Sequence, residues 1–533
     1  MARTNRLSVQ PLFDSGPILY NHRMRKPGTL QAFTIPRLRD VFFVACLGAC
    51  LLLGTRMLNI DSDWGRHLAL GEYMLNTGSI PTRDLLSHTL AGASRPAYEW
   101  LSQVLFALAY RGAGLQGLIL LVGLIISSAH TISYTQTLAR SKLPLLSMLI
   151  AILAAAAASS HWLPRPHVLT FLCLVLWLHA LEKVRRGAAV SLWRFILLML
   201  LWVNLHGGFV FGFLAWFAYL AGAILDQLPA RKASYARPSR GDLGVYSKIG
   251  LVSLASSMIT PSGWANWKAV LNNSSAYVLS RTAETMPVDP AHPWTWPFLL
   301  LLLLASGLVL LDQKDMPASH ILLILGFGAA GLLMGRNVPL FVLAATPIIA
   351  ERLGGRLERG QQWTRLENGI LALQRSLQGI LWPALVSAGV ALAFGIGHYF
   401  GTGQLPPYPI YAFPVRACDW LSEHPQSGEM YNDLNWGGYL LYRLWPSQRV
   451  FIDSQTDFYG EGLIREYEYI LTAGQGWEAT LEEYSVTWII VPRTSQLGAA
   501  LQFHPQWNIV YTDDKTLIAS QSSDLSVEPD WNR

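Results

Sequence analysis

Long apolar runs separated by short polar segments dominate the chain. A helix needs about 20 apolar residues to cross a hydrocarbon layer of about 30 Å, and several runs reach or approach that length. The runs lie at residues 41–58, 115–138, 145–160, 167–182, 194–205, 207–226, 249–261, 297–311, 318–334, 338–350 and 378–400. This pattern predicts a mainly α, polytopic membrane bundle of about eleven spans.

Two pairs of spans lie within single apolar stretches, 194–226 and 318–350, and each stretch needs a turn. Basic segments flank the first stretch on both sides, and cytoplasmic loops collect Lys and Arg, so we expect the chain to turn back at NLHGG. In the second stretch a single span would leave Arg336 near the bilayer centre at a cost of at least ~2.5 kcal/mol. We therefore expect a hairpin at GRNVP.

The distribution of basic residues orients the chain. With eleven crossings, all the basic segments lie on one side of the membrane, which identifies that side as cytoplasmic. The basic segments are 1–40, 139–142, 183–194, 231–248 and 352–375. The N-terminal segment lacks the apolar region and cleavage site of a signal peptide. We expect a cytoplasmic segment 1–40, a membrane domain 41–400 with an outer loop 59–114, and an extracytoplasmic domain 401–533, in the inner (plasma) membrane.

After about residue 405 the apolar runs give way to shorter patterns. RVFIDS, VTWIIVPR and WNIVYTDDKTLIAS are typical of strands, and LIREYEYIL and WEATLEEY are typical of helices. They predict a small α/β domain that binds the acceptor or is structural. Asp433, Asp453 and Asp457 stand beside aromatic residues, as in a carbohydrate-binding surface, although turn-forming aspartates show the same pattern.

Composition narrows the possible functions. The chain has 533 residues, of which 52% are hydrophobic and 14% charged, so its main solvent is lipid. The formal net charge of +6 comes from clusters between spans, which topology explains without nucleic acid as a partner. Acidic residues are almost absent from the span centres, which argues against an ion-coupled transporter.

Acidic residues gather instead on the predicted outer face. Asp61 and Asp63 follow the first span, Glu99 begins the amphipathic stretch EWLSQVLFALAYR, and Glu284 lies in the loop 262–296. The helical periodicity within loop 59–114 predicts helices that lie along the interface. A carboxylate there can deprotonate a hydroxyl, but each of these acids can also be an ordinary solvated loop residue.

Basic and polar candidates accompany these acids. We expect substrate contacts from His67 and Glu284 in the outer loops and from residues at the outer ends of spans, which are Arg165, His167, His206, Arg336 and Asn337. Arginine suits phosphate because its planar fork can donate two parallel hydrogen bonds. The alternative is that these residues anchor the helices at lipid headgroups.

Several stretches resemble one known group. DSDWGRHLALGEYMLNTGSIPTRDLLSHTLAGASRPAYEWLSQVLFALAYRGAGLQGL resembles the first outer loop of bacterial membrane proteins related to the C-type glycosyltransferase superfold, which use polyprenyl-phosphate-linked sugars. RPHVLTFL, LWVNLHGGFVFG, GRNVPLF, YNDLNWGGYLLYRLWP and VFIDSQTDFYG resemble the same group in the same order. The resemblance matches Asp61, Asp63 and Glu99 to catalytic acids. In one departure, Gly65 and Arg66 stand where relatives tend to have a tryptophan pair.

The resulting hypothesis is an inverting membrane glycosyltransferase. A polyprenyl-phosphate sugar is the donor, a glycan, lipid or protein is the acceptor, Asp61 or Asp63 is the general base, and Arg165 or Arg336 binds the phosphate. Asp61 and Asp63 can also chelate a divalent cation, Mg²⁺ or Mn²⁺, but the superfold includes metal-independent members, so metal use stays open. The alternatives are a non-catalytic assembly or scaffold protein and a transporter of lipid or polysaccharide. The oligomeric state is not predicted.

Overall fold

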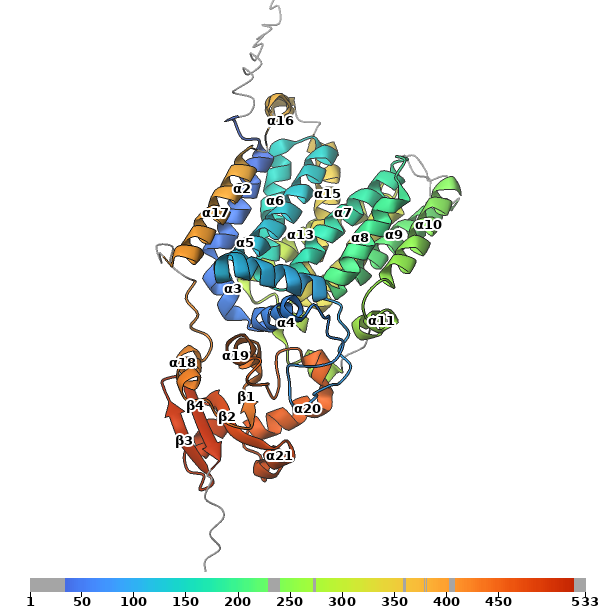
Figure 1. The fold of residues 1–533 in the computed structure, drawn as a ribbon. Helices are drawn as coiled ribbons and strands as arrows, with labels where there is room; N and C mark the ends of the chain where they lie inside the picture. The colour runs from blue at the N-terminus through green and yellow to red at the C-terminus, as the bar shows by residue number, and fades with distance from the viewer. Residues whose placement is uncertain are drawn as a thin grey trace, which may run out of the picture.

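Each predicted span coincides with a helix in the computed structural model, which describes residues 34–228, 240–271, 275–357, 361–377, 379, 381–401 and 408–521. The helices form one bundle (Figure 1). They are α2 (Leu38–Leu52) followed by α3 (Gly54–Ile60), α5 (Trp100–Ser141), α6 (Pro144–Ala158), α7 (His167–Arg185), α8 (Leu192–Leu205), α9 (Val210–Leu225), α10 (Arg240–Ser257), α13 (Trp296–Asp312), α14 (Ala318–Leu333), α15 (Val338–Leu357) and α17 (Leu381–Phe400).

Seven helices of the described part are long and apolar enough to cross a membrane, or eight if α2 and α3, bent by 53°, form one span. The helices α8 and α14 are apolar but shorter. Eleven crossings therefore stay a prediction. Both predicted turns are present, as the short helices η2 (Gly207–Phe209) and η5 (Gly335–Asn337).

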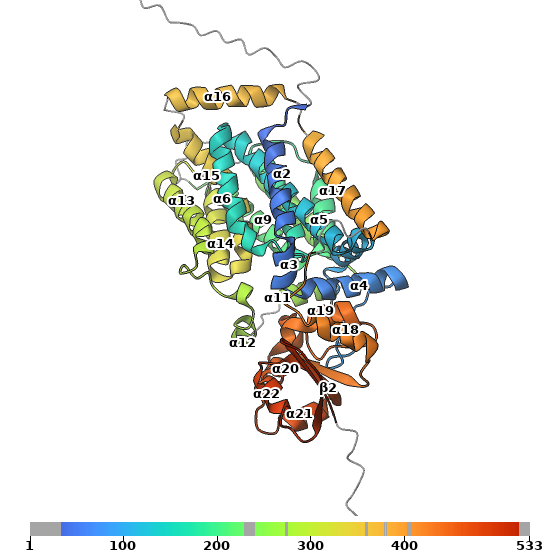
Figure 2. The same cartoon turned by 90° about the vertical axis from the view of Figure 1, so that its left-hand side faces the viewer.

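Interfacial helices cover one end of the bundle. Helix α4 (Asp63–Thr77) lies across this end, as Figure 2 shows. Helix α5 is interrupted by the non-helical residues Ala113 and Gly114. This break separates the amphipathic stretch from the predicted span at 115–138, because Gly114 has the positive φ of 59° that a glycine accommodates without strain.

Helix α16 (Gln361–Ser376) lies at the opposite end of the bundle (Figures 1 and 2). Its Glu367 carboxylate accepts hydrogen bonds from the backbone nitrogens of Leu145 (2.9 Å) and Leu146 (3.1 Å) at the start of α6. A carboxylate at a helix N-terminus accepts hydrogen bonds from the otherwise unpaired N–H groups and interacts favourably with the positive end of the helix dipole. This end carries the described part of the basic segment 352–375, whereas residues 1–33 of the segment 1–40 and residues 231–239 of the segment 231–248 lie outside the described residues.

The C-terminal part contains a four-stranded sheet with strand order β1-β2-β4-β3. Its strands are β1 (Glu429–Asn432), β2 (Val486–Pro492), β3 (Trp507–Thr512) and β4 (Thr516–Gln521). Only β1 and β2 pair in parallel, so their connection has to cross over, and it does so through α20 (Thr456–Leu471) and α21 (Trp477–Glu483). The other helices of this part are α18 (Val415–Glu423), α19 (Gly437–Leu444) and α22 (Gln496–Leu501).

The prediction of a strand at RVFIDS is wrong, and the first strand of this part is β1, earlier in the chain. In this segment Val450 forms an isolated bridge with Ser87. The Asn432 side chain accepts from the backbone nitrogen of Phe451 and donates to the carbonyl of Ile452, both at 2.8 Å. These backbone groups are therefore satisfied by a side chain where a strand would use a neighbouring strand.

Two glycine-rich helices join the C-terminal part to the membrane part. Helix α19 packs across α4, and a Cβ atom added at Gly65 would collide with the carbonyl oxygen of Gly438. A Cβ atom at Gly438 would collide in turn with the carbonyl oxygen of Ser62. Only glycine permits such an approach of two backbones, so Gly65 and Gly438 allow α4 and α19 to pack closely.

The two ends of the bundle should face opposite sides of the membrane. We expect an impermeant maleimide to label Glu482→Cys on α21 in intact cells and to label Asn368→Cys on α16 only after permeabilisation. The native cysteines are buried, so they give little background. Labelling of both variants from the same side would contradict the predicted topology.

Candidate functional site

A cavity of about 370 Å³ lies between the interfacial end of the bundle and the C-terminal part. Nine of the ten site residues predicted from the sequence line it, namely Asp63, His67, Glu99, Arg165, His167, His206, Glu284, Arg336 and Asn337. The tenth, Asp61, is in contact with Arg165 and is not part of the lining. The C-terminal part contributes Ser454, Gln455, Thr456 and Asp457.

The Arg165 side chain binds three carboxylates. Its Nε donates to Asp61 Oδ2, its Nη2 lies 3.2 Å from Asp63 Oδ2, and its Nη1 lies 2.9 Å from both oxygens of Glu284. Burial alone would lower the pKa of the guanidinium, but the three acids outweigh it and raise this pKa well above its usual value. Arg165 is therefore a permanent cation that ties the first outer loop to the loop 262–296.

Asp63 is the most strongly held of these acids. Its Oδ1 accepts a hydrogen bond from Ser454, and its Oδ2 lies 3.3 Å from Arg66 Nη2. Burial opposes ionisation of Asp63, but Arg165 and Arg66 outweigh it and lower the pKa of its carboxyl. For Asp61 burial prevails over Arg165 and raises the pKa. Asp63 is thus ionised but fully paired.

The arrangement does not fit a bound Mg²⁺ or Mn²⁺. Asp61 Oδ1 accepts from the backbone nitrogen of Asp63 at 3.1 Å, and the other three oxygens of the pair are held by Arg165, Arg66 or Ser454. A divalent cation would have to displace Arg165. Within the described ranges no group of three or more His, Cys, Asp or Glu side chains is placed to hold a metal.

Glu99 is different from the other acids of the cavity. It precedes α5 as the N-cap residue, its side chain is 14% exposed, and it forms no ion pair with a described arginine. Its carboxylate oxygens lie 3.9 Å from His67 Nδ1 and 3.8 Å from His206 Nε2. Burial raises the pKa of Glu99 to about 7 against the opposing effect of Arg66. Glu99 can therefore exchange a proton near neutral pH.

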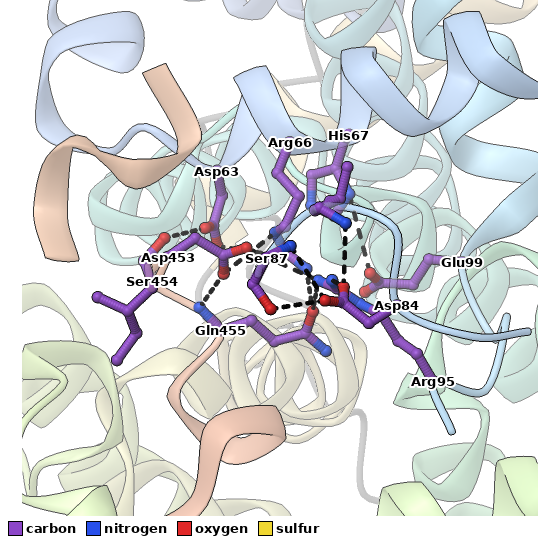
Figure 3. Close-up of polar contacts among 12 residues, drawn as sticks. Asp63, Arg66, His67, Asp84, Ser87, Arg95, Glu99, Asp453, Ser454 and Gln455 are labelled. Atoms are coloured by element: carbon purple, nitrogen blue, oxygen red, sulfur yellow. Dashed lines mark hydrogen bonds and ion pairs between the residues drawn. The ribbon is translucent and has the colours of Figure 1, made fainter. Parts of the chain in front are cut away.

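A buried ionic network, shown in Figure 3, connects α4 with the segment before α20. Arg66 and Arg95 both donate to Gln455 Oε1, and each lies 3.8 Å from an oxygen of Asp453. Arg95 also pairs with Asp84 at 2.5 Å. Removing one partner of such a network typically costs about 3–5 kcal/mol, so the C-terminal part is a fixed wall of the cavity.

Sequence reasoning missed most of this network. Arg95 and Asp84 are not among the predicted site residues, and the sequence pattern favours a turn over a sugar contact for Asp453. Arg66 offers a usable signal, because it is a charged departure from the resembling group. Its partner in the C-terminal part, however, lies 387 positions further along the chain.

Arg336 lines the cavity as an exposed side chain and makes no ion pair with any described residue. Nearby on the wall, His167 donates from Nε2 to the backbone carbonyl of His161 at 2.8 Å. Asn337 donates to the carbonyl of Ala330 at 3.1 Å, which closes the turn between α14 and α15. Arg336 is therefore the cavity arginine whose hydrogen-bonding capacity is free for a ligand.

Comparison with known proteins identifies the fold. No protein-family profile and no curated protein matches the chain. Among solved structures, the oligosaccharyltransferase AglB of Archaeoglobus fulgidus, in complex with an inhibitory peptide and a dolichol-phosphate, is similar with a TM-score of 0.58 and 12% identity over 92% of this chain and 75% of that chain. The apo form of the Archaeoglobus fulgidus oligosaccharyltransferase is similar with a TM-score of 0.55 and 11% identity, also over 92% of this chain and 75% of that chain.

A weaker likeness, with a TM-score of 0.45 and 12% identity, is to ArnT of Cupriavidus metallidurans bound to undecaprenyl phosphate, over 92% of this chain and 99% of that chain. The likeness to the oligosaccharyltransferase confirms the predicted fold, which is that of the C-type glycosyltransferases. The chain is a multi-pass membrane protein of this fold.

Loss of Arg165 should destabilise the protein severely. We expect Arg165→Met to lower the free energy of unfolding by about 3–5 kcal/mol, because the buried Asp61 and Asp63 and the partly buried Glu284 would lose their shared cation. Thermal unfolding of the purified protein in detergent measures this loss. The control is Arg111→Met, which breaks an exposed pair with Glu72 and should be nearly neutral. Equal melting temperatures for the two variants would contradict the role of Arg165.

Proposed function

We propose that this protein transfers a sugar from a polyprenyl-phosphate-linked donor to an acceptor hydroxyl, with inversion at the anomeric carbon. One observation carries the proposal: a single cavity contains an unpaired arginine and a carboxyl group whose pKa is near 7. The fold supports it, and the similar oligosaccharyltransferase was solved with a dolichol-phosphate. The acceptor is a glycan, a lipid or a protein.

In this proposal Glu99 is the general base. Its carboxylate takes the proton of the acceptor hydroxyl while the acceptor oxygen bonds to the anomeric carbon from the face opposite the phosphate. The bond between the anomeric carbon and the phosphate oxygen breaks, and its electron pair leaves with the polyprenyl phosphate. A base with a pKa close to the working pH combines a large deprotonated fraction with a useful proton affinity.

We assign the base role to Glu99 in place of Asp61 and Asp63, the residues favoured by sequence reasoning. Asp61 does not line the cavity, and Asp63 is bonded to Arg165, Arg66 and Ser454. A carboxylate held by two arginines is a weak base. We therefore assign Asp61 and Asp63 to holding Arg165.

Arg336 is the proposed phosphate ligand, since the guanidinium of Arg165 is already saturated by acids. Arg336 stands in the turn between α14 and α15, at the end of the bundle that we place on the extracytoplasmic side of the inner membrane. A lipid-linked phosphate lies near this depth while its chain stays among the helices. The C-terminal part would then meet the acceptor.

Replacement of Glu99 tests the function. We expect Glu99→Gln to reduce transfer by at least about 100-fold, because general-base catalysis contributes about 10²–10⁴-fold. Radiolabelled dolichyl-phosphate glucose, mannose and arabinose, incubated with membranes that contain the protein, provide the measurement. Wild-type activity should rise as the pH increases through about 7, because only the ionised carboxyl accepts a proton.

Glu72→Gln is the matched control, since Glu72 is a partly exposed acid of the same outer loop that pairs with Arg111. It should retain wild-type transfer. If Glu99→Gln also retained it at equal protein levels, Glu99 would not be the base.

Replacement of Arg336 tests phosphate binding without any sugar. We expect Arg336→Ala to weaken the affinity for dolichyl phosphate about 10- to 100-fold, the equivalent of one lost charged hydrogen bond. Titration of the purified protein with dolichyl phosphate, followed by tryptophan fluorescence, measures it. Arg83→Ala, which removes a basic residue of the first outer loop that does not line the cavity, should leave the affinity unchanged.

A further inference from the structure

The turn between α8 and α9 surrounds His206 with hydrogen-bond donors. His206 Nδ1 accepts from the backbone nitrogen of Gly208 at 2.9 Å and lies 2.8 Å from Thr170 Oγ1. Thr170 Oγ1 accepts from Trp202 Nε1 at 2.9 Å, so its own proton is free to point at His206. The backbone N–H of Gly208 can only donate, so Nδ1 is an acceptor and the neutral imidazole carries its proton on Nε2, which lies 3.8 Å from Glu99 Oε1.

This arrangement leaves no room for variation at Gly208. A Cβ atom there would collide with Thr170 Oγ1 and would lie 2.7 Å from His206 Nδ1. The side chains of Thr170 and Trp202 are buried, so no solvent replaces their hydrogen bonds. Gly208, the second glycine of the HGG sequence, thus makes room for the hydrogen bonds around His206 as well as for the turn.

Further hydrogen bonds tie the turn to the start of α5, next to Glu99. Trp100 Nε1 donates to Asn204 Oδ1 at 2.7 Å, and Ser102 Oγ donates to the carbonyl of Leu205. The position of His206 relative to Glu99 is therefore fixed from both sides.

We propose that Thr170 is a positioning residue for sugar transfer, because it holds His206 in the tautomer whose Nε2–H faces the Glu99 carboxyl. The inference rests on the proposed role of Glu99 as the base. A donor that faces the carboxyl favours its ionised form, which is the form that accepts the acceptor's proton. Thr170 itself does not exchange a proton with the substrate.

Other charged and titratable groups act on Glu99 from the elements packed around it. They are Asp63, Arg66 and His67 on α4, Tyr98 beside it, Arg165 before α7 and Asp457 on α20. None of them forms a hydrogen bond with Thr170, whose described bonds go to His206 and Trp202. A change in Thr170 therefore acts on Glu99 through His206.

The variants Thr170→Val and Thr170→Ser test the proposal, because valine keeps the shape of threonine without its hydroxyl and serine keeps the hydroxyl. We expect Thr170→Val to lower the turnover number about tenfold at an unchanged KM for the dolichyl-phosphate sugar, the equivalent of one lost hydrogen bond. The acid limb of its pH profile should move to higher pH, because the carboxyl loses a donor that favours ionisation. Thr170→Ser should restore both.

The matched control is Thr137→Val, since the Thr137 hydroxyl is also buried in a helix of the bundle but bonds within its own helix, to Ser133. It should retain the wild-type rate and pH profile. If Thr170→Val also retained both while Glu99→Gln was inactive, the proposal would be overturned and the proposed function would stand.

A measurement independent of catalysis separates the two claims. Nitrogen NMR of the ¹⁵N-histidine-labelled protein, with His206 assigned by its loss in His206→Gln, should show Nε2 protonated and Nδ1 unprotonated at pH 7. The Nδ1 signal should shift in Thr170→Val and not in Thr137→Val. A proton on Nδ1 in the wild type would overturn the inference about Thr170 even if sugar transfer were confirmed. Full transfer by Glu99→Gln would refute the role of Glu99 as the base, and the NMR spectrum would still determine the tautomer of His206.

Discussion

The ion pairs of Arg165 with Asp61, Asp63 and Glu284 determine how the rest of the cavity works. Each of these charges is costly to bury alone, and the shared guanidinium offsets the cost for all of them at once. The cluster joins segments that precede α4, precede α7 and precede α13, so it fixes the outer ends of three parts of the bundle relative to one another. Loss of Arg165 would deprive all three carboxylates of their shared cation.

This constraint divides the charged residues into two groups. Arg165, Asp61, Asp63 and Glu284 hold the architecture. Glu99, whose ion-pair partners among the described residues are histidines, and Arg336, which has no ion-pair partner there, carry the proposed chemistry. The C-terminal part belongs to the first group, because Ser454 bonds to Asp63 and Asp453 lies between two buried arginines. The membrane bundle and the C-terminal part therefore form one cavity together.

The sequence predicts the arrangement of helices better than the pairing of charges. Apolar length and basic clusters locate the spans and the turns at NLHGG and GRNVP, and the same topology places the candidate residues at one end, where nine of the ten line the cavity. Hydropathy does not tell which charges meet, so the sequence could not show that Arg165 is saturated and Arg336 is not. The strand prediction for RVFIDS is wrong for a related reason. The Asn432 side chain makes the hydrogen bonds that a strand would make with a neighbouring strand.

The most direct test of this account is an experimental structure of the protein with both dolichyl phosphate and Mg²⁺ added. The account predicts that the phosphate binds at Arg336 while Arg165 stays on its three carboxylates, with no cation between Asp61 and Asp63. A magnesium ion on these two aspartates with Arg165 turned towards the phosphate would contradict it.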